Sequence, residues 1–310
     1  MQKNAKNTVS IENKFARVWR HKLLLLMFLP AFVTIILFNY IPMAGILLAF
    51  RDINTRTLPF GSEWISLGNF DFIMQQRFWT YFQNTVVIAG LKILFGFPAP
   101  ILLAIMINEV RNKPFKRATQ SLSYLPHFIS WAIVANLLDR LLSTDVGLIN
   151  GFIRAFGGIP TNFLAQVDWF LPLVVITHIW KTVGYSSIIY LAAISQINPE
   201  LYEAAMVDGA GRIKRIRHIT LPGMAPMISI LLILTIPGII NAGFDQIYLM
   251  TNPFNQPVAE ILDTYILRVG LSNGNYGIAT AIGLFNSAIA LLLLLISNHF
   301  SKRMGGATLW

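Results

Sequence analysis

Long apolar runs, separated by short polar and basic segments, dominate the chain. A helix needs about 20 apolar residues to cross the hydrocarbon core of a bilayer. The pattern predicts six such helices, at Leu23–Ile41, Asn84–Ile107, Leu122–Leu138, Trp169–Leu191, Pro222–Ala242 and Ile278–Ser297. The first run continues without charge to Phe50, so we expect Pro42 and Gly45 to turn the chain at the membrane surface. The third run is the shortest, and Pro126 and His127 interrupt it.

The composition places the chain among membrane proteins. Hydrophobic residues make up 55% of its 310 positions and charged residues 12%, about half of the charged share of a typical soluble domain. Mean hydropathy is +0.59. A soluble domain of this size could not cover so much apolar surface. We therefore expect an all-α membrane protein with six transmembrane helices. The absence of cysteine excludes disulfides and thiolate metal sites.

The net charge of +10 is distributed unevenly between the two sides of the predicted helices. Sixteen of the 24 Lys and Arg residues lie in the N-terminus, the C-terminus, and the loops between the second and third and the fourth and fifth spans. The three opposite loops hold six. Because cytoplasmic loops carry the excess of Lys and Arg, both termini are expected in the cytoplasm. The charge is thus explained by topology, and no nucleic-acid partner is expected.

One cytoplasmic segment, Glu203–Pro222 (EAAMVDGAGRIKRIRHITLP), is charged and bent between two apolar spans. Asn198 can cap a helix that has Pro199 at its first position, where the missing N–H costs nothing. Gly209 and Gly211 supply the bend, since glycine adopts positive φ without steric cost. A second short helix then leads into the fifth span. The pattern predicts a helix–turn–helix knob at the cytoplasmic end of the bundle.

The knob resembles a known motif. The series Glu203-Ala204-Ala205, three residues, Gly209, nine residues, Ile219, one residue, Leu221-Pro222 is similar to the EAA loop of binding-protein-dependent ABC importer permeases. The resemblance covers roughly Asn84 to Ser297, the five-helix core of such permeases. The stretches NYIPMAGILLAFRDIN and GIATAIGLFNSAIALLLLLISN look like the oligosaccharide and polysaccharide subgroup, whose sugar branch also has an extra N-terminal span, as in maltose-type carbohydrate permeases.

The resemblance implies a domain organisation. Residues 1–22 form a basic cytoplasmic N-terminus, 23–83 the first transmembrane helix and an extracellular loop, 84–297 the permease core with the EAA loop at 199–222, and 298–310 a cytoplasmic C-terminus. In the family this loop enters a cleft of a separate ATPase subunit. Carried over by position, the contact residues are Glu203, Ala204, Ala205, Asp208, Gly209 and Ala210. The alternative is a basic amphipathic turn that rests on anionic lipid.

No enzymatic motif is present. The sequence contains no Gly-Lys dipeptide and hence no phosphate-binding P-loop. Its five histidines lack zinc-like spacing. We therefore expect no catalytic residue, metal or cofactor on this chain. The resemblance implies that ATP and Mg²⁺ are bound by two partner ATPase subunits.

Polar residues inside spans are costly and usually face the bundle interior, so they mark candidate positions on a translocation path. The candidates for the path are Tyr124, His127, Trp131, His178, Lys181, Tyr185, Asn241 and Asp245. Asn136 and Asn286 are further polar positions. His178, Lys181 and Tyr185 share one helical face, at spacings of three and four residues. They offer the aromatic and hydrogen-bonding groups that hold sugars. Related maltose-type permeases place their binding residues around these spans. At the end of the fifth span, however, this chain has Ile240 and Gly243 rather than a run of asparagines.

Two lysines lie within predicted spans. For Lys181 two roles stay open, one in substrate binding or gating and one as a structural contact between helices. Lys92 is expected to pair with a neighbouring helix. A single membrane histidine such as His127 is more often a hydrogen-bonded helix contact than a ligand.

The three outer loops, Phe50–Phe82, Asp139–Asp168 and Gly243–Gly277, contain 33, 30 and 35 residues. Such lengths are unusual in a compact bundle. We expect these loops to form a docking platform for an extracellular substrate-binding protein. Plain connectors are the alternative.

The sequence therefore predicts a multi-pass protein of the bacterial cell membrane, one permease subunit of an ATP-driven importer for an oligosaccharide. Its expected partners are a second homologous permease, two ATPase subunits, a secreted binding protein and membrane lipid. An ion- or proton-coupled carrier is the alternative from another class, but no predicted span holds the Asp or Glu that proton coupling favours. An importer permease for a non-sugar solute and a non-transporting scaffold are the others.

Overall fold

The structure, a computed structural model, describes residues 22–53 and 63–303, and helices form about four fifths of them. Among these residues the one pairing of extended backbone is a bridge between Arg51 and Trp64. The expected all-α fold class is confirmed. The elements in chain order are α2 (Lys22–Ile35), η1 (Ile36–Tyr40), α3 (Ile41–Met43), η2 (Ala44–Phe50), η3 (Gly68–Met74), α4 (Gln76–Gly96), α5 (Pro98–Glu109), α6 (Lys113–Tyr124), η4 (Leu125–Phe128), α7 (Trp131–Leu142), α8 (Leu148–Ala155), α9 (Val167–Ser195), α10 (Pro199–Val207), α11 (Arg212–Arg215), η5 (Ile216–Thr220), α12 (Leu221–Thr235), η6 (Ile236–Ile240), α13 (Phe244–Met250), α14 (Gln256–Ala259), α15 (Leu262–Leu267), η7 (Arg268–Ser272) and α16 (Tyr276–Arg303).

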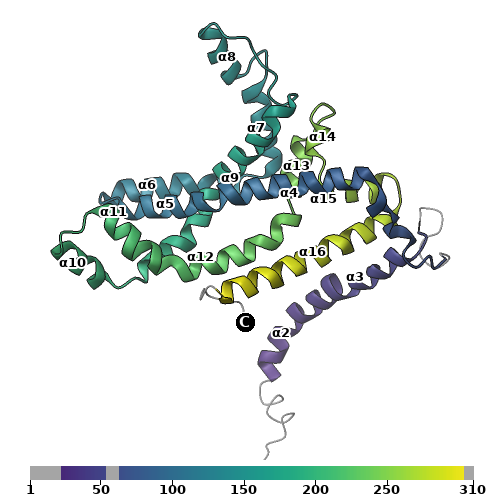
Figure 1. Cartoon of the computed structure of the whole chain (residues 1–310), viewed down its shortest axis with the longest axis horizontal. Coiled ribbons are helices and arrows are strands. Elements are labelled where there is room, and N and C mark those ends of the chain that lie inside the picture. The colour runs from purple at the N-terminus through teal and green to yellow at the C-terminus, as the bar shows by residue number, and fades with distance from the viewer. Residues whose placement is uncertain (1–21, 54–62, 304–310) are drawn as a thin grey trace, which may run out of the picture.

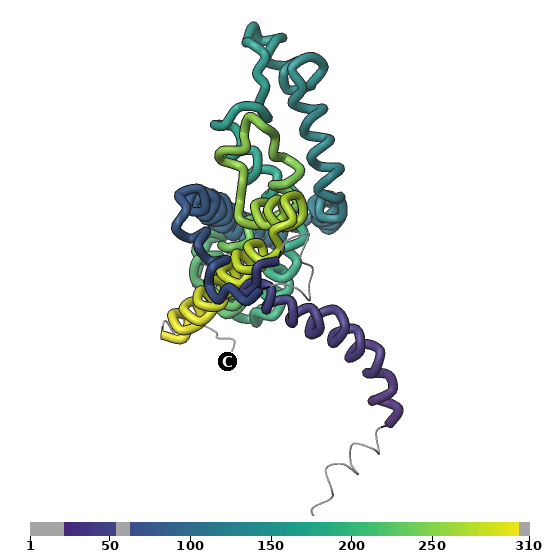
Figure 2. Tube along the Cα trace, turned by 90° about the vertical axis from the view of Figure 1, so that its right-hand side faces the viewer, coloured from purple at the N-terminus to yellow at the C-terminus, as the bar shows by residue number. Residues whose placement is uncertain are grey.

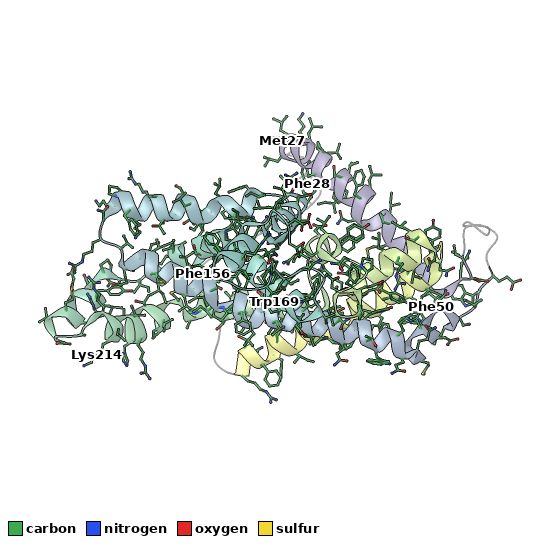
Figure 3. All side chains as sticks on the ribbon, turned by 90° about the horizontal axis from the view of Figure 1, so that it is seen from above. Met27, Phe28, Phe50, Phe156, Trp169 and Lys214 are labelled. Carbon is green, nitrogen blue, oxygen red and sulfur yellow. The ribbon has the colours of Figure 1, made fainter. Side chains whose placement is uncertain are left out.

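The long helices run along the longest axis of the molecule, with α4, α5, α12 and α16 drawn across the page in Figure 1. Helix α9 packs against α4, α5 and α12, and α16 packs against α12, η2 and η6. Helices α10 and α11 lie at one end of the bundle and α15 at the other. Seen from above, Lys214 and Phe50 mark these opposite ends (Figure 3).

Four continuous helical stretches are long and apolar enough to cross a membrane, at 22–50, 76–109, 212–240 and 276–303. A fifth is possible if the bent pair 113–128 and 131–142 forms one span. Helix α9 contains the predicted fourth span and is 29 residues long, but its polar residues keep it out of this group. The count of six spans therefore stays a prediction.

The structure corrects two details of the predicted spans. The expected turn at Pro42 and Gly45 is absent, because the backbone stays helical as far as Phe50. The wider turn of η1 precedes the proline, so the missing N–H does not break the helix there. The predicted span Leu122–Leu138 is also not one straight helix, since the chain bends by 100° between η4 and α7.

Helix α2 diverges from the rest of the molecule. None of its residues is buried, and Met27 and Phe28 are 78% and 55% exposed. Figure 2 shows the purple tube leaving the bundle, and Figure 3 places both side chains at its edge. The contact between this N-terminal stretch and the bundle comes at its far end, where Ala49 is fully buried next to α16.

Three apolar clusters form the core. One joins α5, α9 and α12 around Tyr190 and Met224, near the knob. A second joins α4, α9 and α13 around Val174 and Ile247, in the middle. The third joins η3, α4 and α16 around Phe78, at the far end. Helices α4 and α9 each contribute to two of the three clusters, so this pair of helices forms the centre of the fold.

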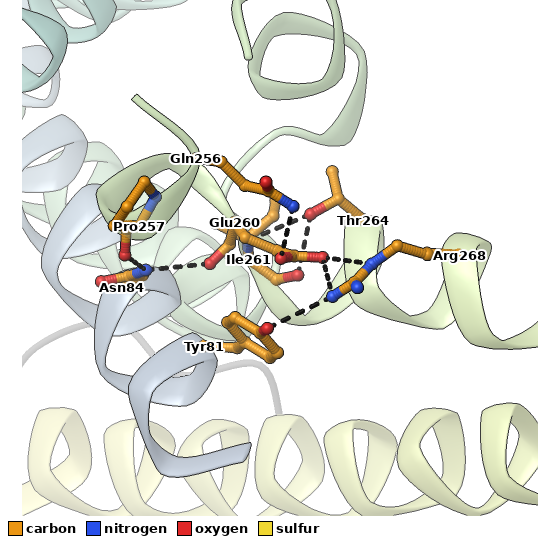
Figure 4. Close-up of polar contacts among 8 residues, drawn as sticks. All are labelled: Tyr81, Asn84, Gln256, Pro257, Glu260, Ile261, Thr264 and Arg268. Carbon is orange, nitrogen blue, oxygen red and sulfur yellow. Dashed lines mark hydrogen bonds and ion pairs between the residues drawn. The ribbon is translucent and has the colours of Figure 1, made fainter. Parts of the chain in front are cut away.

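A polar network fastens the loop after α13 to α4 (Figure 4). Asn84 Nδ2 donates to the carbonyl oxygens of Pro257 and Glu260, at 2.9 and 3.0 Å. The carboxylate of Glu260 pairs with Arg268, with 2.6 Å between Oε1 and Nη2. Arg268 also donates to the hydroxyl of Tyr81, at 3.2 Å. Glu260 is 7% exposed and Arg268 39% exposed in this pair, so the network as a whole, rather than the ion pair alone, fastens the loop to α4.

A close contact between α6 and α9 yields a stability prediction. A Cβ on Gly184 of α9 would lie only 1.9 Å from the backbone oxygen of Ser123 on α6. Because backbone cannot move aside cheaply, we expect Gly184→Ala to destabilise the fold by roughly 2 kcal/mol or more. A lower midpoint of thermal unfolding in detergent is the measurement. In the matched control, Gly283→Ala on α16, the new Cβ would meet nothing within 4 Å. Equal midpoints for the two variants would contradict this account of the α6–α9 contact.

Candidate functional site: knob and central cavity

The knob is a helix–turn–helix, as the residues predict. The Asn198 side chain accepts a hydrogen bond from the backbone N–H of Glu200, at 3.0 Å, and so caps α10. Helix α10 ends at Val207, and Gly209, two residues later, has a φ of +76°, a conformation that favours glycine. The N–H of Ala210 then donates to the oxygen of Ala205. Gly211 has φ −68°, so Gly209 alone needs the special freedom of glycine.

The knob exposes most of its surface. Among the six residues expected to contact an ATPase, Ala205 and Ala210 are half-buried and the rest are exposed. Val207 and Ile213 are 88% and 81% exposed. A hydrogen bond of 3.0 Å between the hydroxyls of Tyr202 and Thr220 joins its two helices. Apolar and acidic side chains are thus exposed on a turn that a hydrogen bond holds in place. Such a surface is suited to binding another protein.

A cavity of about 520 Å³ lies in the middle of the bundle, between α4, α9 and α12. Its volume is in the range of small-molecule sites. Three of the eight predicted path residues line it, namely Trp131, His178 and Asn241. Apolar walls come from residues such as Ile93 and Leu231. The cavity therefore combines an indole, an imidazole and an amide with apolar surface.

Lys92 also lines this cavity. Its side chain is 7% exposed, and Nζ donates to the carbonyl oxygen of Ala242 at 2.5 Å. The next residue, Gly243, has φ +87°. A Cβ there would lie 2.9 Å from Nζ, so glycine both permits the turn and leaves room for the ammonium group. Lys92 was expected to pair with a neighbouring helix, and its partner is instead the turn between η6 and α13.

Lys181 lies at the break between η4 and α7. Its ammonium group donates to the carbonyl oxygens of His127 and Ile129, at 2.7 and 2.5 Å, with Pro126 O at 3.5 Å. Nζ also lies 5.5 Å from the ring centroid of Trp131. A cation is favourable at the C-terminal end of a helix, where carbonyl groups lack partners. The contacts fit the structural alternative for Lys181, and a role in substrate binding stays a prediction.

The other predicted path residues do not line the central cavity. The rings of His127 and Tyr185 stack with their centroids 3.9 Å apart, which agrees with a packed contact for this histidine. The backbone of Tyr124 lies against Gly184. Asp245 is exposed in the first turn of α13.

Sequence reasoning missed Gln246, which also lines the cavity. Its Nε2 donates to Val174 O and to Thr177 Oγ1, at 2.8 and 2.9 Å. Its Oε1 is buried without a hydrogen-bond partner among the described residues. Leaving a buried acceptor unpaired costs about 1–3 kcal/mol. No pattern in the sequence points to Gln246, because the turn at Gly243 brings it to the cavity.

Comparison with known proteins identifies the family. The protein-family model of the binding-protein-dependent transport system inner membrane component matches residues 96–306. The chain belongs to this family. It is 45% identical over 287 residues to the polygalacturonan/rhamnogalacturonan transport system permease protein YteP of Bacillus subtilis (strain 168), covering 92% of this chain and 89% of YteP. It is 42% identical over 289 residues to protein LplB of the same organism, covering 93% and 91%.

Solved structures agree with the family. A crystal structure of a bacterial ABC transporter that imports the acidic polysaccharide alginate matches with a TM-score of 0.86 at 42% identity, covering 93% of this chain and 98% of that chain. The alginate transporter in complex with its pentasaccharide-bound periplasmic protein matches at 0.87 and 40% identity, covering 96% and 100%. The predicted family is confirmed, and the secondary-carrier alternative is set aside. The boundaries 84–297 for the permease core stay a prediction.

The two roles left open for Lys181 predict different effects of Lys181→Met. If the contacts to the η4 carbonyls are structural, we expect the variant to lose roughly 1–3 kcal/mol of stability because buried carbonyls lose their donor. Uptake of acidic and neutral oligosaccharides should then fall together, as the amount of folded importer falls. The measurements are the thermal midpoint in detergent and uptake in proteoliposomes. An unchanged midpoint with a selective loss of acidic substrates would instead establish the substrate role.

Proposed function

We propose that this chain is one of two permease subunits of an ATP-driven importer, and that it forms with a second permease the path for an oligosaccharide. The observation that carries the proposal is the exposed knob of Glu203, Ala204, Ala205, Asp208, Gly209 and Ala210 at one end of an importer-permease fold. Relatives that are 40–45% identical along nearly the whole chain support it.

Coupling to ATP hydrolysis takes place at the knob. Small residues such as Ala204 and Ala205 let α10 enter a cleft of an ATPase subunit, where Glu203 and Asp208 can accept hydrogen bonds from basic or amide groups. The hydroxyl bond between Tyr202 and Thr220 transmits movement of α10 to the helix that continues into α12. ATP and Mg²⁺ belong to the ATPase subunits, since this chain has no phosphate-binding motif.

Substrate arrives from the opposite end of the bundle. A secreted binding protein delivers the oligosaccharide to the loops around η3 and α15, which the network of Glu260 and Arg268 fastens to α4. The relative solved with its periplasmic binding protein supports this partner. The sugar then passes the central cavity, whose aromatic and polar lining suits it.

The chain is a multi-pass membrane protein, and we place both of its termini in the cytoplasm. The distribution of Lys and Arg supports this orientation. It puts the knob on the side where ATP is available and the loops around α15 outside.

The coupling role predicts the effect of two knob variants. Glu203→Lys reverses charge in the docked helix, and Gly209→Val forces a β-branched residue into φ +76°, a strain of about 1–2 kcal/mol. We expect both variants to insert in the membrane but to lose co-purifying ATPase subunits and uptake. Gly211→Ala is the matched control, because its φ is ordinary and a Cβ meets nothing within 4 Å. Full ATPase association by both variants would refute the role of the knob.

The proposed orientation predicts the location of inserted reporters. A reporter after Gly211 should be cytoplasmic, and one near Gly158 extracellular. Gly61, the second extracellular position expected from the sequence, lies outside the described residues. Accessibility of each reporter in intact cells is the measurement. An extracellular result at Gly211 would remove the ATPase contact from the knob.

A further inference from the structure

Lys92 is a deeply placed cation without a counter-ion. It forms no ion pair with any described residue, the one described ion pair being that of Glu260 and Arg268. Its side chain is 7% exposed, near the middle of the continuous helical stretch 76–109. A charged group among membrane helices is costly unless something compensates it. The chain supplies one carbonyl oxygen, that of Ala242.

The ammonium group of Lys92 keeps donor capacity for a ligand. It has three N–H groups, and one of them is used by Ala242 O. Gly243 lies directly against Nζ, where a Cβ would be only 2.9 Å away, and the same lysine borders the central cavity. Lys181, by contrast, is enclosed by the carbonyls of the η4 break. The two lysines therefore differ in free donors, although both are almost fully buried.

The wall around Lys92 is built from groups that bind sugars. Trp131 offers an aromatic face, and Thr182, Ser186 and Asn241 offer hydrogen-bonding groups on the same cavity. Gln246 Oε1 is buried, lacks a donor among the described residues, and belongs to the same lining. A hydroxyl or a water molecule must satisfy it. A partly used cation and an unpaired acceptor thus share one cavity.

We propose that Lys92 binds a carboxylate of an acidic oligosaccharide as it passes the central cavity, and so sets a preference for charged sugars. The inference rests on the proposed function and adds the group that distinguishes acidic from neutral substrate. The carboxylate supplies the negative charge that the bundle lacks, and Lys92 meets it as part of the cavity lining. The competing counter-ion is an acidic residue of the second permease subunit. With such a partner, Lys92 would have no effect on the preference for acidic over neutral substrates.

The test combines variants of Lys92 with matched substrates in the complete importer reconstituted with its binding protein. The probes are oligogalacturonate and oligomannuronate, each with a counterpart whose carboxyl groups are reduced to alcohols. Uptake by a variant is divided by uptake by the parent for each probe, so the preference of the binding protein cancels. We expect Lys92→Met to lower this ratio for an acidic probe at least about tenfold relative to its neutral counterpart, the factor that corresponds to roughly 1.4 kcal/mol. Lys92→Arg should recover most of the acidic uptake.

The control is the same substitution at the other lysine. Lys181→Met should change both ratios equally. If Lys92→Met does not assemble, Lys92→Gln takes its place, because its amide retains a donor for Ala242 O and lacks the charge. Equal losses on acidic and neutral probes, or a parent importer that takes only neutral sugars, would overturn the role of Lys92 while leaving the importer function intact. A parent that imports none of the four probes while its ATPase responds to the binding protein would count against the oligosaccharide proposal itself.

Discussion

The ammonium group of Lys181 lies at the bend between η4 and α7. Between η4 and α7 the helix axis turns by 100°, which leaves carbonyls at the end of η4 without helical partners. Lys181 donates to those of His127 and Ile129, and Ser130 begins α7 by accepting from Ile133 N–H. An unpaired carbonyl costs more among apolar helices than in water. The bend, the direction of α7 and the position of Trp131 on the cavity all depend on this contact.

The apolar pattern of the sequence was sufficient to predict where the long helices lie, but not where they break. The spans ending at Ser297 and Leu191 fall inside α16 and α9, because long apolar runs can satisfy their backbone only as helix. Prolines were a poorer guide. Pro42 was expected to turn the chain and lies inside a helix, whereas the break near Pro126 is a full change of direction. The difference lies in what surrounds each proline: a widened turn precedes the first, and a lysine from another helix supports the second.

The candidate site shows the same division between local and tertiary information. The cap at Asn198 and the positive φ of Gly209 were predictable, since both follow from neighbouring residues. Helical spacing placed His178 and Lys181 on one face, yet His178 lines the cavity and Lys181 reaches a different helix break. Lys92 was predicted only to pair with a helix, because its relation to Gly243 and Gln246 spans about 150 positions of sequence. Spacing along one helix cannot identify which neighbour each face meets.

Membrane helices gain little from apolar contact with one another, because lipid tails are as apolar as leucine. Specific association then depends on close approach and on polar bonds. Gly184 lets α9 contact the backbone of α6. The Thr85 hydroxyl of α4 accepts a hydrogen bond from the backbone N–H of Leu262 and so fixes the start of α15. Lys92 joins α4 to the turn after η6. Helix α2 has none of these devices: the one side-chain hydrogen bond found within it, from Thr34, goes to its own Pro30. It diverges from the bundle for that reason, and its surface is satisfied equally by lipid or by the apolar face of another subunit.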